Sequence, residues 1–121
     1  MIVTARAALE TLFNNAGFNV SAFVPDRITP PLAIIAPSGD WVTGGDTFGM
    51  FRIAFDVTLV TQTASNAKVT DELDQMVDDA IAAVTTATGF YCGSVGSPSY
   101  LSVQNAEFLS ASMTVYQNIK L

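Results

Sequence analysis

The stretch that decides the fold runs from Met50 to Gln62 and reads MFRIAFDVTLVTQ. Large apolar side chains occupy every second position, and smaller or polar side chains occupy the positions between them. Because successive side chains of a β-strand point to opposite faces, this period of two predicts one long, half-buried strand. The apolar face comprises Phe51, Ile53, Phe55, Val57 and Leu59, and the other face comprises Arg52, Ala54, Asp56 and Thr58.

The residues from Pro30 to Gly49 precede this strand and suggest a second strand and a loop. Leu32 to Ala36 is an unbroken apolar run with prolines on both sides, which predicts a short buried strand. Pro37 to Asp40 is a turn cluster, and Gly44-Gly45 tolerates the positive φ angles of tight hairpin turns. We therefore expect Trp41 to Phe48 to form a small β-arm or a flexible loop.

Two segments have the apolar spacing of amphipathic helices. In the first, Thr4 is a candidate N-cap and Gly17 a candidate stop. The second is expected from Ser65 or Asn66 to Thr88, with Gly89 as its stop. The apolar faces comprise Ala5, Ala8, Leu9, Leu12, Phe13 and Ala16 in the first, and Val69, Leu73, Met76, Val77, Ala80, Ile81 and Val84 in the second.

The remaining segments complete an α+β order. Phe18 to Val24 looks extended, Gly93 to Ser99 looks like a loop, and Tyr100–Val103 is expected to pair with Glu107–Ile119 across a turn at 104–106. The expected order is α-β-β-β-α-β-β. We predict a single domain, residues 1–121, in which an antiparallel sheet carries both helices on one face.

Composition restricts the classes of partner. Charged residues make up only 13%, against about 25% in an average soluble domain. Either part of the surface is covered in an oligomer, or Ser, Thr, Asn and Gln solvate it. The net charge is −6 and the five basic residues are scattered, which disfavours DNA binding through phosphates. No apolar run approaches the ~20 residues that span a bilayer, and Met1 to Phe13 lacks a signal-peptide pattern.

Residue chemistry gives no reason to expect an enzyme. The chain has no histidine, which excludes Ser-His-Asp and Cys-His arrangements and removes the commonest metal ligand. Cys92 is the only cysteine, so no internal disulfide can form, and it is expected to be a small buried hydrophobe. The glycine-rich segment Gly44 to Gly49 lacks the lysine of a phosphate loop. We expect no catalytic, cofactor-binding or metal-binding residues and no cofactor.

Two groups of residues remain as candidate contact surfaces. Asp71, Asp74 and Asp78 share a face of the second helix, which is either an ion site or, as we favour, a solvated acidic face. Trp41 is either a core residue or an interface anchor, since large aromatics are enriched at the centres of interfaces. The candidate subunit interface comprises Trp41, Val42, Asp46, Phe48 and Arg52.

The element order and several segments together resemble the small tail terminator proteins, also called neck or tail-completion proteins, of long-tailed bacteriophages. The segments that carry the resemblance are the Pro30-Pro31 strand, Pro37-Ser-Gly-Asp-Trp-Val42, Gly44-Gly-Asp-Thr-Phe-Gly49, Phe51 to Val57, the helix with Leu73-Asp74, and the closing Ser112-Met-Thr-Val115 strand. The resemblance implies a subunit of a ring, usually hexameric, that caps the tail tube and joins it to the head. It is a structural protein of the virion neck, made in the bacterial cytoplasm.

The resemblance also implies partners: copies of the same chain, the tail tube protein and the head-tail connector proteins, with no membrane. The Asp40–Gly49 arm and the Gly93–Ser99 loop are the expected contact elements, and Arg52 could pair with a carboxylate of a neighbour or of its own subunit. DNA would pass through the ring without specific binding, and an acidic lumen formed by Asp71, Asp74 and Asp78 would repel it. The alternatives are a head-completion or connector protein and a small ligand-binding or enzymatic α+β domain.

Overall fold

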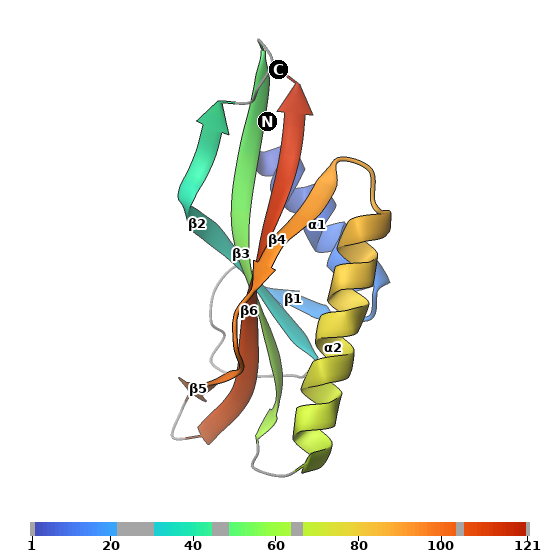
Figure 1. Cartoon of the computed structure of the whole chain (residues 1–121), viewed down its shortest axis with the longest axis vertical. Coiled ribbons are helices and arrows are strands. Elements are labelled where there is room, and N and C mark those ends of the chain that lie inside the picture. Colours follow the sequence, from blue (N-terminus) through green and yellow to red (C-terminus); the bar gives the residue numbers. More distant parts are fainter. Residues whose placement is uncertain (1, 22–30, 45–48, 64–66, 104–105, 121) are drawn as a thin grey trace.

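A computed structural model describes residues 2–21, 31–44, 49–63, 67–103 and 106–120. These residues form an α+β fold with two helices and one six-stranded sheet (Figure 1). The seven expected elements occur in the expected order, and an additional strand, β4, lies between α2 and β5. The elements are α1 Ile2–Asn15, β1 Asn19–Ser21, β2 Leu32–Gly44, β3 Met50–Thr63, α2 Ala67–Thr86, β4 Phe90–Val95, β5 Ser99–Val103 and β6 Ala106–Lys120.

The sheet has the strand order β1-β2-β3-β6-β4, with β5 also paired to β6. The prediction of an antiparallel sheet is wrong at one edge, because β1 and β2 are parallel, with Asn19 opposite Leu32 and Ser21 opposite Ile34. The other pairs are antiparallel, and the longest ladder joins β3 to β6 from Met50–Lys120 to Thr63–Phe108. Alternation of apolar residues predicts which face a strand buries, but it carries no information about strand direction.

β4 and β5 lie one after the other along the same edge of β6. Phe90 to Cys92 pair with the second half of β6, and β5 pairs with its first half. The predicted loop from Gly93 to Ser99 is therefore wrong at both ends, since only residues 96–98 lie between the two strands. Gly93 and Ser94 lie at a register shift between the pairs Cys92–Val115 and Val95–Met113, so a bulge accommodates them within β4.

β2 is much longer than the predicted strand from Leu32 to Ala36. The strand continues through Pro37 to Gly44, so the expected turn at Pro37 to Asp40 is wrong. Between the pairs Pro37–Phe55 and Val42–Ile53, the four residues Ser38 to Trp41 of β2 face only Ala54 of β3, which makes a wide bulge. Proline is tolerated at bulges and edges, and β1 covers the outer edge of β2 only as far as Ile34.

The main core lies where the apolar face of β3 meets both helices. Ile53, Phe55, Val57 and Leu59 are fully buried, as the alternation predicts. The same cluster includes Ala5, Leu9 and Phe13 of α1, Met76, Ala80 and Val84 of α2, and Met113 and Val115 of β6. A smaller cluster of Leu32, Ile34 and Val60 packs against Leu101 and Phe108.

The helix ends agree in part with the sequence analysis. Gly17 and Gly89 have φ angles of 97° and 88°, which suit glycine at the end of a helix. Thr4 is not an N-cap, because α1 already begins at Ile2 and Thr4 lies inside its first turn. Neither helix, within the described part of the chain, is long and apolar enough to cross a membrane.

Candidate functional site

The ends of three strands extend beyond the helices at one end of the molecule (Figure 1). We call this region the arm; it comprises Val42–Gly44 of β2, Met50–Arg52 of β3 and residues 117–120 of β6. Its strands are joined by regular pairs, including Gly44 with Phe51 and Phe51 with Ile119. The predicted Asp40–Gly49 arm is thus a paired extension of the sheet over the residues described, with β6 as a third strand that the sequence did not indicate.

Trp41 lies in the bulge of β2 at the base of the arm. Its side chain is 36% exposed, so it does not belong to the core, which was one of its two expected roles. The neighbouring Val42 is half-buried and packs against the main core cluster. The indole is therefore accessible for contact with a partner.

Arg52 has an aromatic partner within its own chain. Its guanidinium carbon lies 4.7 Å from the ring centroid of Tyr116, which also stacks on Tyr91 with centroids 5.0 Å apart and planes 23° apart. The three side chains form a cation–aromatic stack across β3, β6 and β4. Such a contact contributes about 0.5–2 kcal/mol, so the stack fixes Arg52 on this face.

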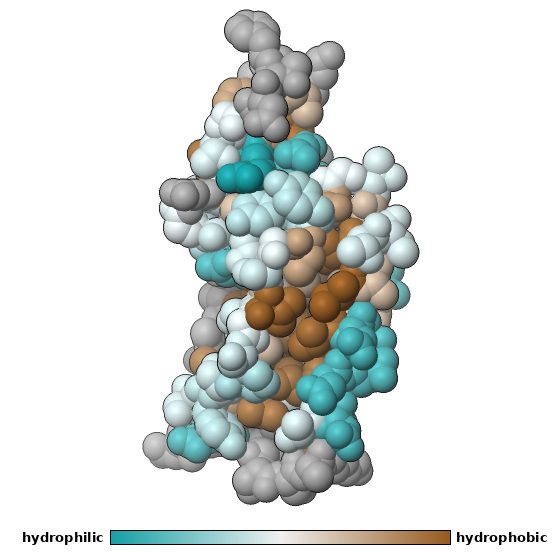
Figure 2. All heavy atoms as spheres, in the orientation of Figure 1, coloured by the Kyte–Doolittle hydropathy of each residue, from teal (hydrophilic) through white to brown (hydrophobic). Residues whose placement is uncertain are grey.

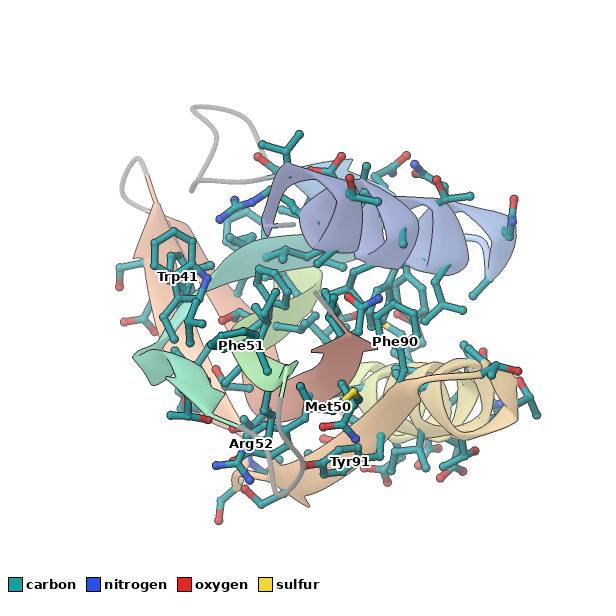
Figure 3. The ribbon with its side chains drawn as sticks, turned by 90° about the horizontal axis from the view of Figure 1, so that it is seen from above. Trp41, Met50, Phe51, Arg52, Phe90 and Tyr91 are labelled. Atoms are coloured by element: carbon teal, nitrogen blue, oxygen red, sulfur yellow. The ribbon has the colours of Figure 1, made fainter. Side chains whose placement is uncertain are left out.

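The candidate interface residues do not all come together. Trp41 and Arg52 lie on opposite sides of Phe51 in the end-on view (Figure 3). Arg52 pairs with Thr43 on one face of the arm, whereas Phe51 pairs with Ile119 on the other face. Asp46 and Phe48, the remaining members of the predicted interface, lie outside the described residues.

Gly93 allows the aromatic stack to form. A Cβ at this position would clash with the ring of Tyr116, so the ring lies directly over the backbone of β4. This cluster was not predicted from the sequence. A signal for it existed, because Tyr116 occupies a position of β6 at which the alternation otherwise places small polar residues.

The face of the sheet that carries this stack also carries polar cross-strand pairs, and the smaller apolar cluster lies farther along it. Thr58 and Ser112 lie opposite each other with their hydroxyl oxygens 3.1 Å apart. The Thr114 hydroxyl donates to Asp56 Oδ1 at 3.4 Å. Cross-strand pairs of this kind stabilise a solvated sheet face, and they offer no nucleophile with an adjacent base.

Two buried oxygens in the arm have no hydrogen-bond partner, Thr43 Oγ1 and Gln117 Oε1. A buried polar atom without a partner costs about 1–3 kcal/mol. Each of these two atoms lowers the stability of the arm in the isolated chain.

Asp71, Asp74 and Asp78 are all exposed on α2, as expected of a solvated acidic face. Among the described residues, no group of three or more His, Cys, Asp or Glu side chains lies close enough together to hold a metal ion. The three carboxylates are not equivalent, however. Asp74 and Asp78 border a hollow, which Asp71 does not.

This hollow, which we call the groove, lies between α2 and the junction of β4 and β5. Its volume is about 250 Å³, and its lining comprises Leu73, Asp74, Val77, Asp78, Val95, Gly96, Pro98 and Ala111. Figure 2 shows an apolar stripe in this region, bordered on one side by the hydrophilic surface of α2. The part of the predicted Gly93–Ser99 contact element that lies between the strands is thus one wall of a groove.

Cys92 lies on β4 opposite Val115 and packs, half-buried, against the main core. Burial raises the pKa of its thiol above the ordinary value, because desolvation disfavours the thiolate. A thiol of this kind is a poor nucleophile at neutral pH, which fits the expected role as a small hydrophobe.

Comparison with known proteins adds no identity: the chain matches no protein-family model and no curated protein.

Proposed function

We propose that this chain is a structural subunit of a bacteriophage neck, in which a ring of about six copies caps the tail tube and joins the tail to the head. The observation that carries the proposal is the arm together with the exposed Trp41 at its base. The resemblance noted in the sequence motivates the proposal, and the arm gives it a specific contact element.

The arm has the properties of a surface that becomes covered on assembly. Phe51 and Ile119 continue the apolar face of the core, yet both are only partly buried. Val3, at the start of α1 near the same end of the molecule, is 82% exposed. Contact with a neighbour would bury this apolar surface at about 25 cal/mol per Å² and would stabilise the arm.

In the proposed ring, both helices cover one face of the sheet, and this two-layer unit forms the wall. The arm of one subunit contacts a different surface of the next subunit, because a head-to-tail contact is what generates a closed ring. The tail tube protein and the connector are the partners above and below. DNA passes through without specific binding, and the proposal assigns no catalytic residue.

The test compares the wild-type chain with Trp41→Ala by mass in solution and by negative-stain imaging. We expect rings of about six copies for the wild type and folded single chains for Trp41→Ala, since interface anchors cost about 2 kcal/mol or more when truncated. Tyr100→Ala is the matched control, because Tyr100 is 60% exposed on β5, outside the arm. It should assemble as the wild type does.

Wild-type chains that stay single both alone and with purified tail tubes would contradict the proposal. Binding to tail tubes, compared with binding to isolated head connectors, separates a tail terminator from a head-completion protein. We expect the protein to bind the tail tubes and not the isolated head connectors.

A further inference from the structure

The groove is an apolar hollow in an acidic surface. Its floor is formed by Leu73, Val77 and Ala111, and its wall opposite α2 is formed by Val95, Gly96 and Pro98. Asp74 and Asp78 stand on the α2 side with exposed carboxylates. A volume of about 250 Å³ accommodates a large apolar side chain but little more.

The charged side chains of α2 that the structure describes all have the same sign. The described side chains of α2, from Val69 to Thr86, include no lysine or arginine. They include five carboxylates: Asp71, Glu72, Asp74, Asp78 and Asp79. A surface with clustered charge of one sign attracts partners of the opposite sign and repels others.

The strand beside the groove has an open edge. β4 stands at the end of the strand order and pairs only with β6 among the described strands. Its outer backbone groups are therefore available to a further strand, which is the geometry of peptide binding by β-augmentation. Val95, the last residue of β4, also lines the groove, so the open edge leads directly to the hollow.

We propose that the groove binds an extended peptide segment of another protein, in which an apolar residue enters the hollow and basic residues face Asp74 and Asp78. The two carboxylates are four residues apart on the helix, a rise of roughly 6 Å. Alternate residues of an extended strand, which point to the same side, are roughly 6.6 Å apart. Lysine or arginine at alternate positions can therefore reach both carboxylates.

The negative charge of α2 favours a basic peptide over nucleic acid, anionic lipid or a second copy of this chain. The phosphates of nucleic acid and of anionic lipid would be repelled by α2. A second copy of this chain carries a net charge of −6 and is a poorer match than a basic partner. The inference does not depend on the proposed ring, because the arm and the groove are formed by different residues.

This assignment changes one earlier expectation. Asp74 and Asp78 face a protein partner, so an acidic lumen would retain only Asp71 of the three predicted carboxylates.

The test is a selection of random twelve-residue peptides displayed on yeast, with the wild-type protein as the target and Asp74→Lys/Asp78→Lys as the counter-target. We expect the retained peptides to carry lysine or arginine at alternate positions beside an apolar residue. The strongest peptide, added to isotopically labelled protein, should shift the amide signals of β4 and of residues 73–78.

The matched control is Asp71→Lys/Asp79→Lys, which makes the same charge change on the same helix away from the groove. We expect the groove variant to weaken binding about tenfold, which corresponds to two exposed ion pairs, and the control to weaken it much less. Circular dichroism verifies that both variants are folded.

Three outcomes would overturn the inference: no retained peptide, retained peptides without a basic bias, or signal shifts confined to the arm or the polar face. Equal loss of binding in both double variants would also overturn it. Each result leaves the ring proposal to its own test, which uses a different substitution and measures assembly.

Discussion

The two halves of β3 share one alternating pattern but have different surroundings. Phe55 and Leu59 are fully buried beneath the helices, whereas Phe51, on the same face of the same strand, is only partly buried in the arm. The pattern is unbroken from Phe51 to Leu59. The two halves differ because the helices pack over only one of them and end before the strands do (Figure 1).

The apolar side chains of β3 therefore have two different roles. In the covered half, the apolar side chains stabilise the isolated chain. In the arm, similar side chains contribute less to the stability of the isolated chain and are available for contact with a neighbour. The predictions below test this division, from the largest expected effect to the smallest.

Phe55→Ala should be the most damaging change. The ring is fully buried in the main core, and truncation of a buried phenylalanine costs about 3–5 kcal/mol. Chemical denaturation of the isolated chain measures this loss. A loss below about 1 kcal/mol would show that the covered half is not the stabilising part of the sheet.

Gly93→Ala should cost about 1–2 kcal/mol, because the added methyl group displaces the Tyr116 ring from Tyr91 and Arg52. Gly96→Ala is the control, since its Cβ would make an ordinary contact at 3.5 Å with the Ser112 carbonyl oxygen. The near-ultraviolet circular dichroism of tyrosine should change in the first variant alone. An unchanged spectrum for Gly93→Ala would mean that the stack is absent in solution.

Phe51→Ala should lower the unfolding free energy by about 1 kcal/mol or less, since the ring is already partly exposed. Its assembly, measured by mass in solution, should be impaired far more than its stability. If Phe51→Ala were as destabilising as Phe55→Ala, the distinction between the two halves of β3 would fail.

The smallest expected effect is the pH dependence of stability that Cys92 causes, and it occurs only at alkaline pH. Burial raises the pKa of the Cys92 thiol in the folded protein above its ordinary value of 9.0. The contribution of the neutral thiol to the free energy of unfolding is therefore complete below pH 9.0 and is lost as the pH rises through the folded pKa. The difference in stability between the wild type and Cys92→Ala should therefore change only above about pH 9. Alkylation by iodoacetamide should have its midpoint at a higher pH in the folded protein than in the denatured protein.

Much of the fold could be predicted because periodicity and glycine positions report local structure. The alternation from Met50 to Gln62 located β3, and the spacing from Val69 to Val84 located α2. Gly17 and Gly89 marked helix ends because both adopt positive φ angles. These signals belong to single elements and do not require knowledge of their neighbours.

The errors arose where a neighbouring strand decides the structure. Pro37 looked like a turn, but it lies in β2 next to the bulge and beyond the part of the outer edge that β1 covers. Gly93 and Ser94 looked like a loop, but they form a bulge within β4, between the pairs Cys92–Val115 and Val95–Met113. The parallel direction of β1 likewise depends on pairing, which no local pattern encodes.

The sequence predicted single residues of the candidate site but not how they are arranged in space. Trp41 was identified as a possible anchor from its setting in the sequence, and it is exposed. Its separation from Arg52 could not be predicted, because the bulge shifts the alternation of β2. The groove could not be predicted either, since it brings together α2 and the β4–β5 junction, and β4 was not expected as a strand.

The central position of β6 has a consequence for synthesis of the chain. β3 is complete at Thr63, but its longest ladder forms with a strand that begins at Ala106. At about 5–20 residues per second, the ribosome needs several seconds to make the intervening segment. During that interval one whole edge of β3 has no partner strand, so in the cell the nascent chain is exposed to pairing with other polypeptides until its last strand emerges.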